Sequence, residues 1–259
     1  MASTLGLENK VVLVTGGTKG IGRGIAQIFL QEGARVVVCA RREPDSLPAA
    51  GDNRAHFRAL DVRDAAAVDG LVAAIGADFG SLDVLINNAG GTPFGLVADT
   101  EPRVFEKILQ LNLVAPLLVA RAANAAMQQQ KDGGVIINIS SVSSVRPSPG
   151  TAVYGAAKAG LDNLTTSLAV EWAPKVRINS IIAGLIKTEM HHLHYGDEEG
   201  VAAVAGTIPL QRMGLPEDIG KLCAVMASNY NSYMSGANVL VHGGGEAPAF
   251  LNASTANKT

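Results

Sequence analysis

Short apolar runs rich in branched side chains alternate with longer amphipathic stretches along most of the chain, from Val11 to Leu240. The apolar runs have the length and composition of buried strands. They cover residues 11–15, 35–40, 56–60, 82–87, 134–140, 176–182 and 238–243. The amphipathic stretches predict helices at about 20–32, 64–79, 102–130, 151–172 and 216–228. Pro116 lies inside the longest of them, so we expect a kink or a break there.

This alternation is typical of a parallel sheet that helices cover on both faces. It predicts an α/β fold, a single Rossmann-type doubly wound parallel sheet of seven strands with helices on both faces. Because no linker interrupts the pattern, we expect one domain over residues 1–259. The segment 184–214 has no clear regular structure, which favours a substrate lid.

Composition limits the kind of partner. Of the 259 residues, 47% are hydrophobic and 17% are charged, and the net charge is −2. The chain therefore lacks the basic surface typical of proteins that bind nucleic acid or anionic membranes, and a small-molecule partner is the better expectation. No targeting segment or membrane span is predicted, so we expect a cytoplasmic protein. Cys39 and Cys223 lie in apolar runs, which favours buried free thiols.

A glycine-rich turn follows the first predicted strand. Residues 15–22 read TGGTKGIG and lead directly into a predicted helix. Glycines at 16, 20 and 22 permit a tight turn, a close approach to phosphate and close helix packing. The start of the helix adds unpaired N–H groups and a positive dipole end. The turn predicts a dinucleotide-binding domain, although its spacing differs from the commoner G-x-G-x-x-G.

The end of the second strand bears on which dinucleotide binds. Sites selective for NAD usually carry an acidic residue about 20 positions beyond the glycines, whereas this chain has Ala40, Arg41 and Arg42 there. Two guanidinium groups, with Lys19 nearby, would bind a 2′-phosphate, so NADP(H) is predicted to be preferred over NAD(H). The alternative is that these cations are solvated surface charges.

Tyr154 and Lys158 are four positions apart in a predicted helix and therefore share one face. A neighbouring ammonium favours the phenolate, so we expect it to lower the pKa of Tyr154. Ser141 follows the fifth strand, at the edge where ligands collect in such sheets. Its hydroxyl could donate to a substrate carbonyl oxygen. These three residues predict an acid–base site.

The glycine turn, the sequence NNAG at 87–90, Asn112, Ser141 and the Tyr154-x-x-x-Lys158 pair together resemble the short-chain dehydrogenase/reductase family. The likeness covers essentially residues 8–245, and the chain resembles NADP-type members such as 3-oxoacyl-acyl-carrier-protein reductase-like proteins. It implies that Tyr154 is the acid–base, that Lys158 lowers its pKa and binds the nicotinamide ribose, and that Ser141 orients the carbonyl. Asn112 would hold a water that relays protons to Lys158. A homotetramer or homodimer is also implied.

The resemblance also implies which residues hold the cofactor. Asp61 and Val62 would border the adenine, residues 88–90 would line the ribose, and Ile186 and Thr188 would contact the carboxamide and phosphate. With the glycine turn and the cations, the predicted cofactor-binding residues are Gly16, Thr18, Lys19, Gly20, Ile21, Gly22, Arg41, Arg42, Asp61, Val62, Asn88, Ala89, Gly90, Tyr154, Lys158, Gly184, Ile186 and Thr188.

The chain departs from the family pattern at two places. Ala183-Gly184 replaces the usual Pro-Gly after the sixth strand, which leaves that turn less constrained. Val241-His242-Gly243-Gly244 replaces Val-Asp-Gly-Gly near the C-terminus. The departures concern the lid and the expected subunit contacts, and they leave the proposed catalytic residues intact.

Three histidines, His191, His192 and His194, lie in the predicted lid. His191 and His194 could present two imidazoles to zinc, with carboxylates close by at Glu189 and residues 197–199. Hydride transfer assisted by a Tyr–Lys pair needs no Lewis acid, so we predict no metal site. The histidines would instead contact substrate or face solvent.

The sequence therefore predicts an NADP(H)-dependent oxidoreductase that interconverts a carbonyl and an alcohol. Two alternatives stay open. One is a nucleotide-sensing protein of the same fold without catalysis. The other is a metal-assisted enzyme that uses the histidines at 191–194.

Overall fold

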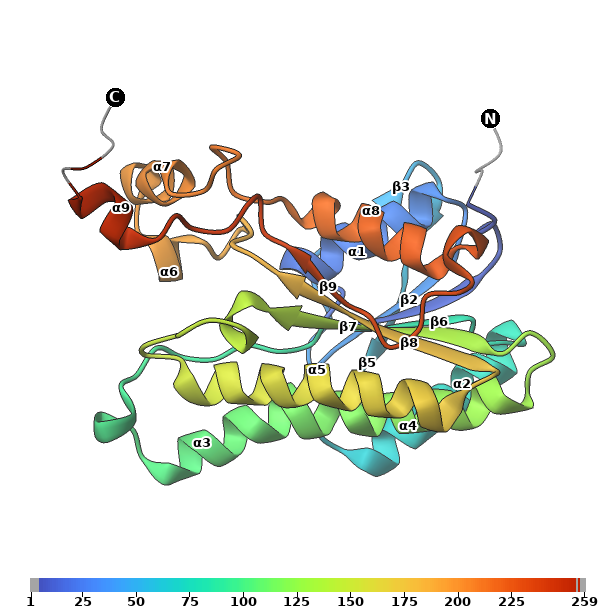
Figure 1. The fold of residues 1–259 in the computed structure, drawn as a ribbon. Helices are drawn as coiled ribbons and strands as arrows, with labels where there is room; N and C mark the ends of the chain where they lie inside the picture. The colour runs from blue at the N-terminus through green and yellow to red at the C-terminus, as the bar shows by residue number, and fades with distance from the viewer. Residues whose placement is uncertain (1–4, 255, 257–259) are drawn as a thin grey trace.

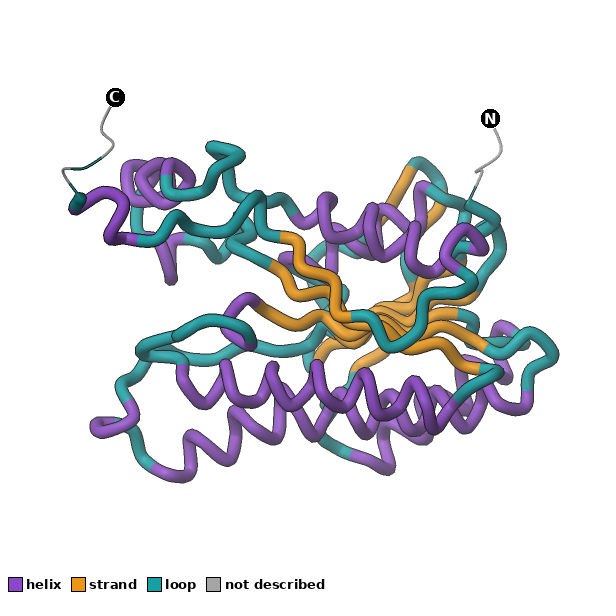
Figure 2. The backbone as a smooth tube through the Cα atoms, viewed as in Figure 1, coloured by secondary structure: helices purple, strands orange, loops and turns teal. Residues whose placement is uncertain are grey.

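The structure of the protein is a computed structural model that describes residues 5–254 and 256, with the backbone alone for residues 193, 194, 251 and 252. A twisted sheet lies between two layers of helices (Figure 1). Figure 2 shows that the strands run through the centre of the molecule and that helices lie above and below them. This is the α/β arrangement that the sequence predicts.

The central sheet has seven parallel strands in the order β5-β2-β1-β6-β7-β8-β9. They are β1 (Val11–Thr15), β2 (Arg35–Ala40), β5 (His56–Ala59), β6 (Val84–Asn87), β7 (Gly134–Ser141), β8 (Val176–Ala183) and β9 (Asn238–Val241). The predicted doubly wound sheet is confirmed. A small antiparallel pair, β3 (Ala49–Ala50) and β4 (Asn53–Arg54), was not predicted because two-residue strands carry no readable periodicity.

Helices α1 (Gly20–Gln31) and α8 (Pro216–Ala227) cover one face of the sheet (Figure 1). The other face carries α2 (Ala65–Phe79), α3 (Pro102–Leu109), α4 (Ala115–Gln129) and α5 (Ala152–Trp172). The predicted helices thus form within a few residues of their expected bounds. Shorter helices are α6 (His192–Tyr195), α7 (Glu198–Gly206), α9 (Ala249–Ala253) and the 3-10 turns Val97–Asp99, Val142–Ser144 and Asn229–Asn231.

Each face of the sheet carries its own apolar core. In β1, Val12 and Val14 pack with α1 and α8, whereas Val11 and Leu13 point to the opposite core. Successive strand residues face opposite sides, so a strand covered on both faces reads as an unbroken apolar run. Cys39 and Cys223 are buried free thiols, one in each core, as predicted.

The expected break near Pro116 takes the form of a π-helical turn, Gln110–Val114, between α3 and α4. The N–H of Ala115 bonds to the oxygen of Gln110, five residues back. Pro116 has no N–H to continue the regular α-helical ladder, which accounts for the local widening. The turn carries Asn112, whose side chain points into the protein.

Among the described residues, the run Pro102–Gln129 is long and apolar enough to cross a membrane by length and composition. In the fold, part of this run covers the sheet, and Val119, Ala123 and Met127 are buried in the core of that face. Packing against the sheet therefore accounts for the apolar residues of α4.

Two glycines let α1 and α8 cross closely. A Cβ added to Gly24 would collide with Pro216, and a Cβ added to Gly220 would lie 3.0 Å from the oxygen of Gly24. The close crossing brings α8 over α1, so α8 helps to fix the helix that follows the glycine turn.

The segment 184–214 is more regular than the sequence predicts, because it contains α6 and α7. Asp197 caps α7 by accepting a hydrogen bond from the Gly200 amide at 3.0 Å. Val201, Ile208 and Met213 form a small core of their own under this helix. The expectation of irregular structure was wrong because such short helices show little hydrophobic periodicity.

Candidate active site

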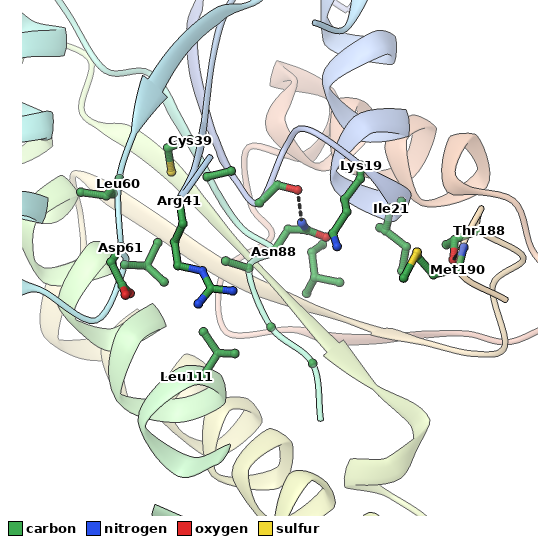
Figure 3. Close-up of a pocket in the computed structure, with 18 of the residues that line it drawn as sticks. Lys19, Ile21, Cys39, Arg41, Leu60, Asp61, Asn88, Leu111, Thr188 and Met190 are labelled. Atoms are coloured by element: carbon green, nitrogen blue, oxygen red, sulfur yellow. Dashed lines mark hydrogen bonds between the residues drawn. The ribbon is translucent and has the colours of Figure 1, made fainter. Parts of the chain in front are cut away.

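A cavity of about 510 Å³ lies at the carboxyl ends of β1, β2, β6 and β7 (Figure 3). It sits where the strand order reverses between β1 and β6, which is the usual ligand position in open parallel sheets. The predicted site residues that line it are Gly16, Lys19, Gly20, Ile21, Arg41, Asp61, Val62, Asn88, Ala89, Gly90, Tyr154, Lys158 and Thr188. Residues far apart in the chain therefore meet in one cavity.

Each of the three glycines that the sequence analysis singled out in the first turn is required there for a steric or conformational reason. Gly16 and Gly20 have φ values of 63° and 53°, in the left-handed region that favours glycine. A Cβ on Gly22 would collide with the side chain of Asn88 and the oxygen of Gly16. Gly22 therefore lies against the loop after β6 and stands behind the cavity wall. Thr18 also lies outside the cavity lining.

Thr15 joins the glycine turn to the loop after β6, a role that sequence reasoning missed. Its hydroxyl accepts hydrogen bonds from the amides of Asn88 and Ala89, both at 3.0 Å. The Asn88 side chain returns a bond to the Thr15 oxygen at 2.9 Å. These bonds hold both loops at the floor of the cavity.

Arg41 and Arg42 are separated by the structure. Both are exposed, but only Arg41 lines the cavity, with its guanidinium pointing into it (Figure 3). Arg63, which the sequence analysis did not single out, also lines the cavity and pairs with Asp61 at 2.6 and 2.9 Å. The hydrogen bonds from Arg63 lower the pKa of Asp61 to about 2.

Lys158 and Tyr154 lie one turn apart on α5, and Lys158 contacts β7, which β1 and β6 separate from the end of β2 that carries Arg41. The Lys158 ammonium nitrogen is 5.7 Å from the centre of the Tyr154 ring and donates to the oxygen of Ile139 at 2.8 Å. Burial lowers the pKa of Lys158 to about 8, and the nearby carboxylate of Asp162 partly offsets this. Sequence reasoning missed Asp162, which lies one further turn along α5.

Ser141 and Tyr154 are hydrogen-bonded through their side chains. Burial raises the pKa of Tyr154, and the bond to Ser141 offsets this in part. The direction is opposite to the expected lowering by Lys158. Removal of the phenolate from water is the largest cause, and Lys158, whose nitrogen is 5.7 Å from the ring centre, does not lower the pKa of Tyr154. Ser141 also accepts from the Ser143 amide at 3.2 Å, which orients its hydroxyl oxygen.

Asn112 lies behind the cavity, in the π-helical turn. Its side chain bonds to the amide and the oxygen of Gly91, both at 2.9 Å, and donates to the oxygen of Ile108 at 2.9 Å. A Cβ added to Gly90 would lie 2.7 Å from the Asn112 side-chain oxygen and 3.6 Å from the Lys158 nitrogen. Asn112 is thus close to Lys158 and fixes the loop after β6.

Gly184 and Ile186 lie away from the main cavity. They line a second cavity of about 260 Å³ together with His242. Ile186 is buried and forms a β-bridge with Gly214, and a Cβ on Gly184 would lie 2.7 Å from the His242 Cα. The two departures from the family pattern, at Ala183 and at His242, therefore lie next to each other, since Ala183 pairs with Val241 in the β8–β9 ladder.

The histidines of the lid are arranged around main-chain and acidic groups. His191 Nδ1 lies 2.6 Å from the Thr188 oxygen, and His191 Nε2 lies 3.7 Å from Glu198. Within residues 5–254 and 256, no group of three or more His, Cys, Asp or Glu side chains is placed to hold a metal ion. The side chain of His194 lies outside the described part of the chain.

Other lining residues carried no signal in the sequence. Leu60, Leu111, Ile139 and Met190 are apolar residues with nothing in the local sequence to mark them as ligand contacts. Glu189 follows the predicted Thr188 and bonds to the glycine turn. Only the fold brings these positions to the same cavity.

The cavity suits a dinucleotide. Gly16 and Gly20 bring backbone to its surface with no side chain in the way, and the start of α1 offers N–H groups there. An ammonium has three donors, and Lys158 uses one on Ile139. Its other donors could bind ribose hydroxyls, and Arg41 could bind a phosphate.

Comparison with known proteins agrees with this geometry. Residues 16–246 match the protein family described as Enoyl-(Acyl carrier protein) reductase. The human Dehydrogenase/reductase SDR family member 4 is 35% identical over 245 residues, which cover 92% of this chain and 88% of that protein. The 3-oxoacyl-acyl-carrier-protein reductase FabG of Vibrio cholerae is 34% identical over 244 residues, which cover 93% of this chain and 98% of that protein.

A solved structure shows the same likeness. The aldohexose dehydrogenase of Thermoplasma acidophilum in ligand-free form superposes with a TM-score of 0.87 at 28% identity, and the match covers 98% of each chain. The family match and the two relatives each span most of this chain. The glycine turn and the Tyr–Lys pair line one cavity. The chain belongs to the short-chain dehydrogenase/reductase family and is an oxidoreductase.

Proposed function

We propose that this oxidoreductase uses NADP(H) to interconvert a carbonyl and an alcohol through Ser141, Tyr154 and Lys158. The observation that carries the proposal is one cavity with two chemically different ends. Tyr154 and Lys158 line it next to β7, and Arg41 and the Asp61–Arg63 pair line it after β2 and β5, on the other side of β1 and β6 in the sheet. The same cavity could thus provide both a group for proton transfer and a group that binds phosphate.

The chain's own residues account for the proton chemistry. A bound nicotinamide cofactor would supply or accept the hydride. Tyr154 would give its proton to the carbonyl oxygen during reduction and take it back during oxidation. Ser141, bonded to Tyr154, would donate to the same oxygen and stabilise its developing charge. Lys158 would stabilise the Tyr154 phenolate, and Asn112 would hold a water that replaces the proton through Lys158.

The preference for NADP(H) rests on charge at the Arg41 end. The carboxylate of Asp61 also lines the cavity, and Arg63 neutralises it through two side-chain hydrogen bonds. Arg41 points into the cavity (Figure 3) and forms no ion pair within 4.0 Å with any described residue, although its charge also helps to lower the pKa of Asp61. A guanidinium in that position would bind a 2′-phosphate, which NAD lacks.

The experiment is a screen of ketones, aldehydes and alcohols with the purified chain, followed by the absorbance of NADPH and NADH. We expect turnover of a carbonyl substrate, with NADPH preferred. On the substrate found, Tyr154→Phe should lower kcat by about 100-fold or more, as expected for loss of a general acid–base. Tyr230→Phe, on the exposed surface, is the matched control. Unchanged turnover in Tyr154→Phe would refute the mechanism, and activity that chelation abolishes and zinc restores would favour the metal-assisted alternative.

We also propose that the chain acts in the cytoplasm as a homodimer or homotetramer. Two buried free thiols suit a reducing compartment. Val170 on α5 is 81% exposed, and Leu240 lies exposed on the edge strand β9. A second copy could cover either position. Light scattering after size-exclusion chromatography tests the assembly, since a monomer at micromolar concentration would contradict it. Cell fractionation tests the compartment.

A further inference from the structure

Glu189 places a carboxylate at the start of α1. The Gly20 amide donates to the Glu189 carboxylate at 2.8 Å, across 169 positions of sequence. The helix has no side-chain cap from Lys19 and no acidic residue in its first turn. Glu189 therefore supplies the negative charge that the N-terminus of a helix attracts.

The residues around Glu189 hold it in this position. A Cβ added to Gly20 would lie 3.6 Å from the methyl group of Thr188, so the lid begins against the glycine turn. The Lys187 ammonium pairs with Glu198 at 3.3 Å, and His191 Nδ1 lies 2.6 Å from the Thr188 oxygen. In Figure 3, Thr188 and Met190 lie beside Ile21 at one end of the cavity. The start of the lid is a compact turn that presents Glu189 to the Gly20 amide.

The Gly20 amide lines the cavity, and N–H groups at this place in a parallel sheet bind phosphate. A carboxylate and a phosphate are both anions, so they cannot share one donor without strong repulsion. A bound pyrophosphate would therefore compete with Glu189 for the start of α1. Lys19, which also lines the cavity, would favour the ligand with more negative charge.

We propose that Glu189 is an internal competitor for the phosphate subsite. In the ligand-free chain its carboxylate occupies the Gly20 amide and holds the lid against the glycine turn. The pyrophosphate of the cofactor displaces it, which releases the start of the lid. Glu189 thus sets cofactor affinity and links cofactor arrival to lid movement. The competitor role rests on the proposed dinucleotide-binding function.

The test compares Glu189→Gln with Glu199→Gln. Both variants remove one negative charge from the lid, but Glu199 lies exposed in the first turn of α7, away from Gly20. Glutamine keeps an oxygen that can accept the Gly20 bond, so Glu189→Gln should fold. We expect it to bind NADPH roughly 3- to 10-fold more tightly than the wild type, given the strength of a charge at a helix N-terminus. Glu199→Gln should change the Kd by less than about twofold.

A second measurement does not depend on cofactor. Hydrogen exchange of the peptide that contains Gly20 should be faster in ligand-free Glu189→Gln than in the wild type, and unchanged in Glu199→Gln. Equal Kd values for the two variants, weaker binding by Glu189→Gln, or unchanged exchange at Gly20 would each overturn the competitor role. If the wild type binds neither NADPH nor NADH, the proposed function fails, and the exchange experiment still tests the contact.

Discussion

The side-chain ammonium of Lys158 donates a hydrogen bond to the main-chain oxygen of Ile139 at 2.8 Å and thereby ties α5 to β7. Lys158 is only 3% exposed, and its burial lowers its pKa to about 8. A lysine charged at neutral pH in this position reduces the stability of the fold, because burial disfavours the charged form. We therefore expect Lys158 to contribute to function, although it lowers the stability of the fold.

Lys158→Met should separate these two effects. We expect turnover to fall by about 100-fold or more, because Tyr154 loses its neighbouring charge. The free energy of unfolding at pH 7 should rise by about 1–2 kcal/mol, since the lost bond to Ile139 offsets part of the desolvation that is removed. Urea denaturation of both proteins measures the difference.

The pH dependence of that difference has a definite sign. The folded-state pKa of Lys158, about 8, lies below the unfolded value of 10.5. The unfolded chain therefore binds more protons between these values, so wild-type stability gains from rising pH in that window. The advantage of Lys158→Met should be full below pH 8 and should shrink as the pH rises toward 10.5. A variant less stable than the wild type at pH 7 would contradict the argument.

Arg41 and Arg42 offer a matched pair for cofactor preference. Arg41 lines the cavity, whereas Arg42 is exposed outside it. Arg41→Ala should weaken NADPH binding by about 10- to 100-fold, the range for loss of a charged hydrogen bond, and should change NADH binding little. Arg42→Ala should alter both by less than about threefold. Titrations with each cofactor measure this, and tighter binding of NADH by the wild type would show that the guanidinium argument is wrong.

Apolar patterning predicted the sheet because its central strands β1, β2, β6, β7 and β8 are buried on both faces and read as apolar runs, whereas the edge strands β5 and β9 are partly exposed. Spacing also placed Tyr154 and Lys158 on one helical face, since four positions on a helix fix a contact locally. Neither kind of signal reports contacts between distant segments. Arg63 was missed, and Glu189 was considered only as a carboxylate near the histidines, because their roles come from contacts with Asp61 and Gly20. The lid helices were missed because they are short.

The close crossing of α1 and α8 was not predicted either, because it is a contact between segments that are distant in the sequence. The crossing can be tested by its effect on stability. Gly24 lies against Pro216, so Gly24→Ala should force the helices apart and lower the free energy of unfolding by about 1–3 kcal/mol. Gly76, in α2, has nothing within 4 Å of an added Cβ. Gly76→Ala should therefore stabilise the chain by about 0.5–1 kcal/mol. Thermal or urea denaturation measures both, and equal effects of the two substitutions would rule out the steric explanation.

Gly90 controls the space between Asn112 and Lys158. Its Cβ, if present, would lie 2.7 Å from the Asn112 side-chain oxygen and 3.6 Å from the Lys158 nitrogen. Gly90→Ala should push the Asn112 side chain away and loosen its bonds to Gly91. We expect kcat to fall by about 10- to 100-fold, as is typical when positioning residues shift by about 1 Å. Steady-state kinetics with the substrate found by the screen measures the loss.

A double-mutant cycle shows whether Gly90 acts through Asn112. If the added methyl group works by displacing Asn112, then Gly90→Ala and Asn112→Ala remove the same interaction, and the double variant should lose little more activity than either single variant. Fully additive losses would show that the methyl group acts elsewhere, most directly by blocking ligand entry next to Lys158. The Kd for NADPH distinguishes these outcomes, because displacement of Asn112 should leave cofactor binding within about threefold of the wild type, whereas blocked entry should weaken it strongly.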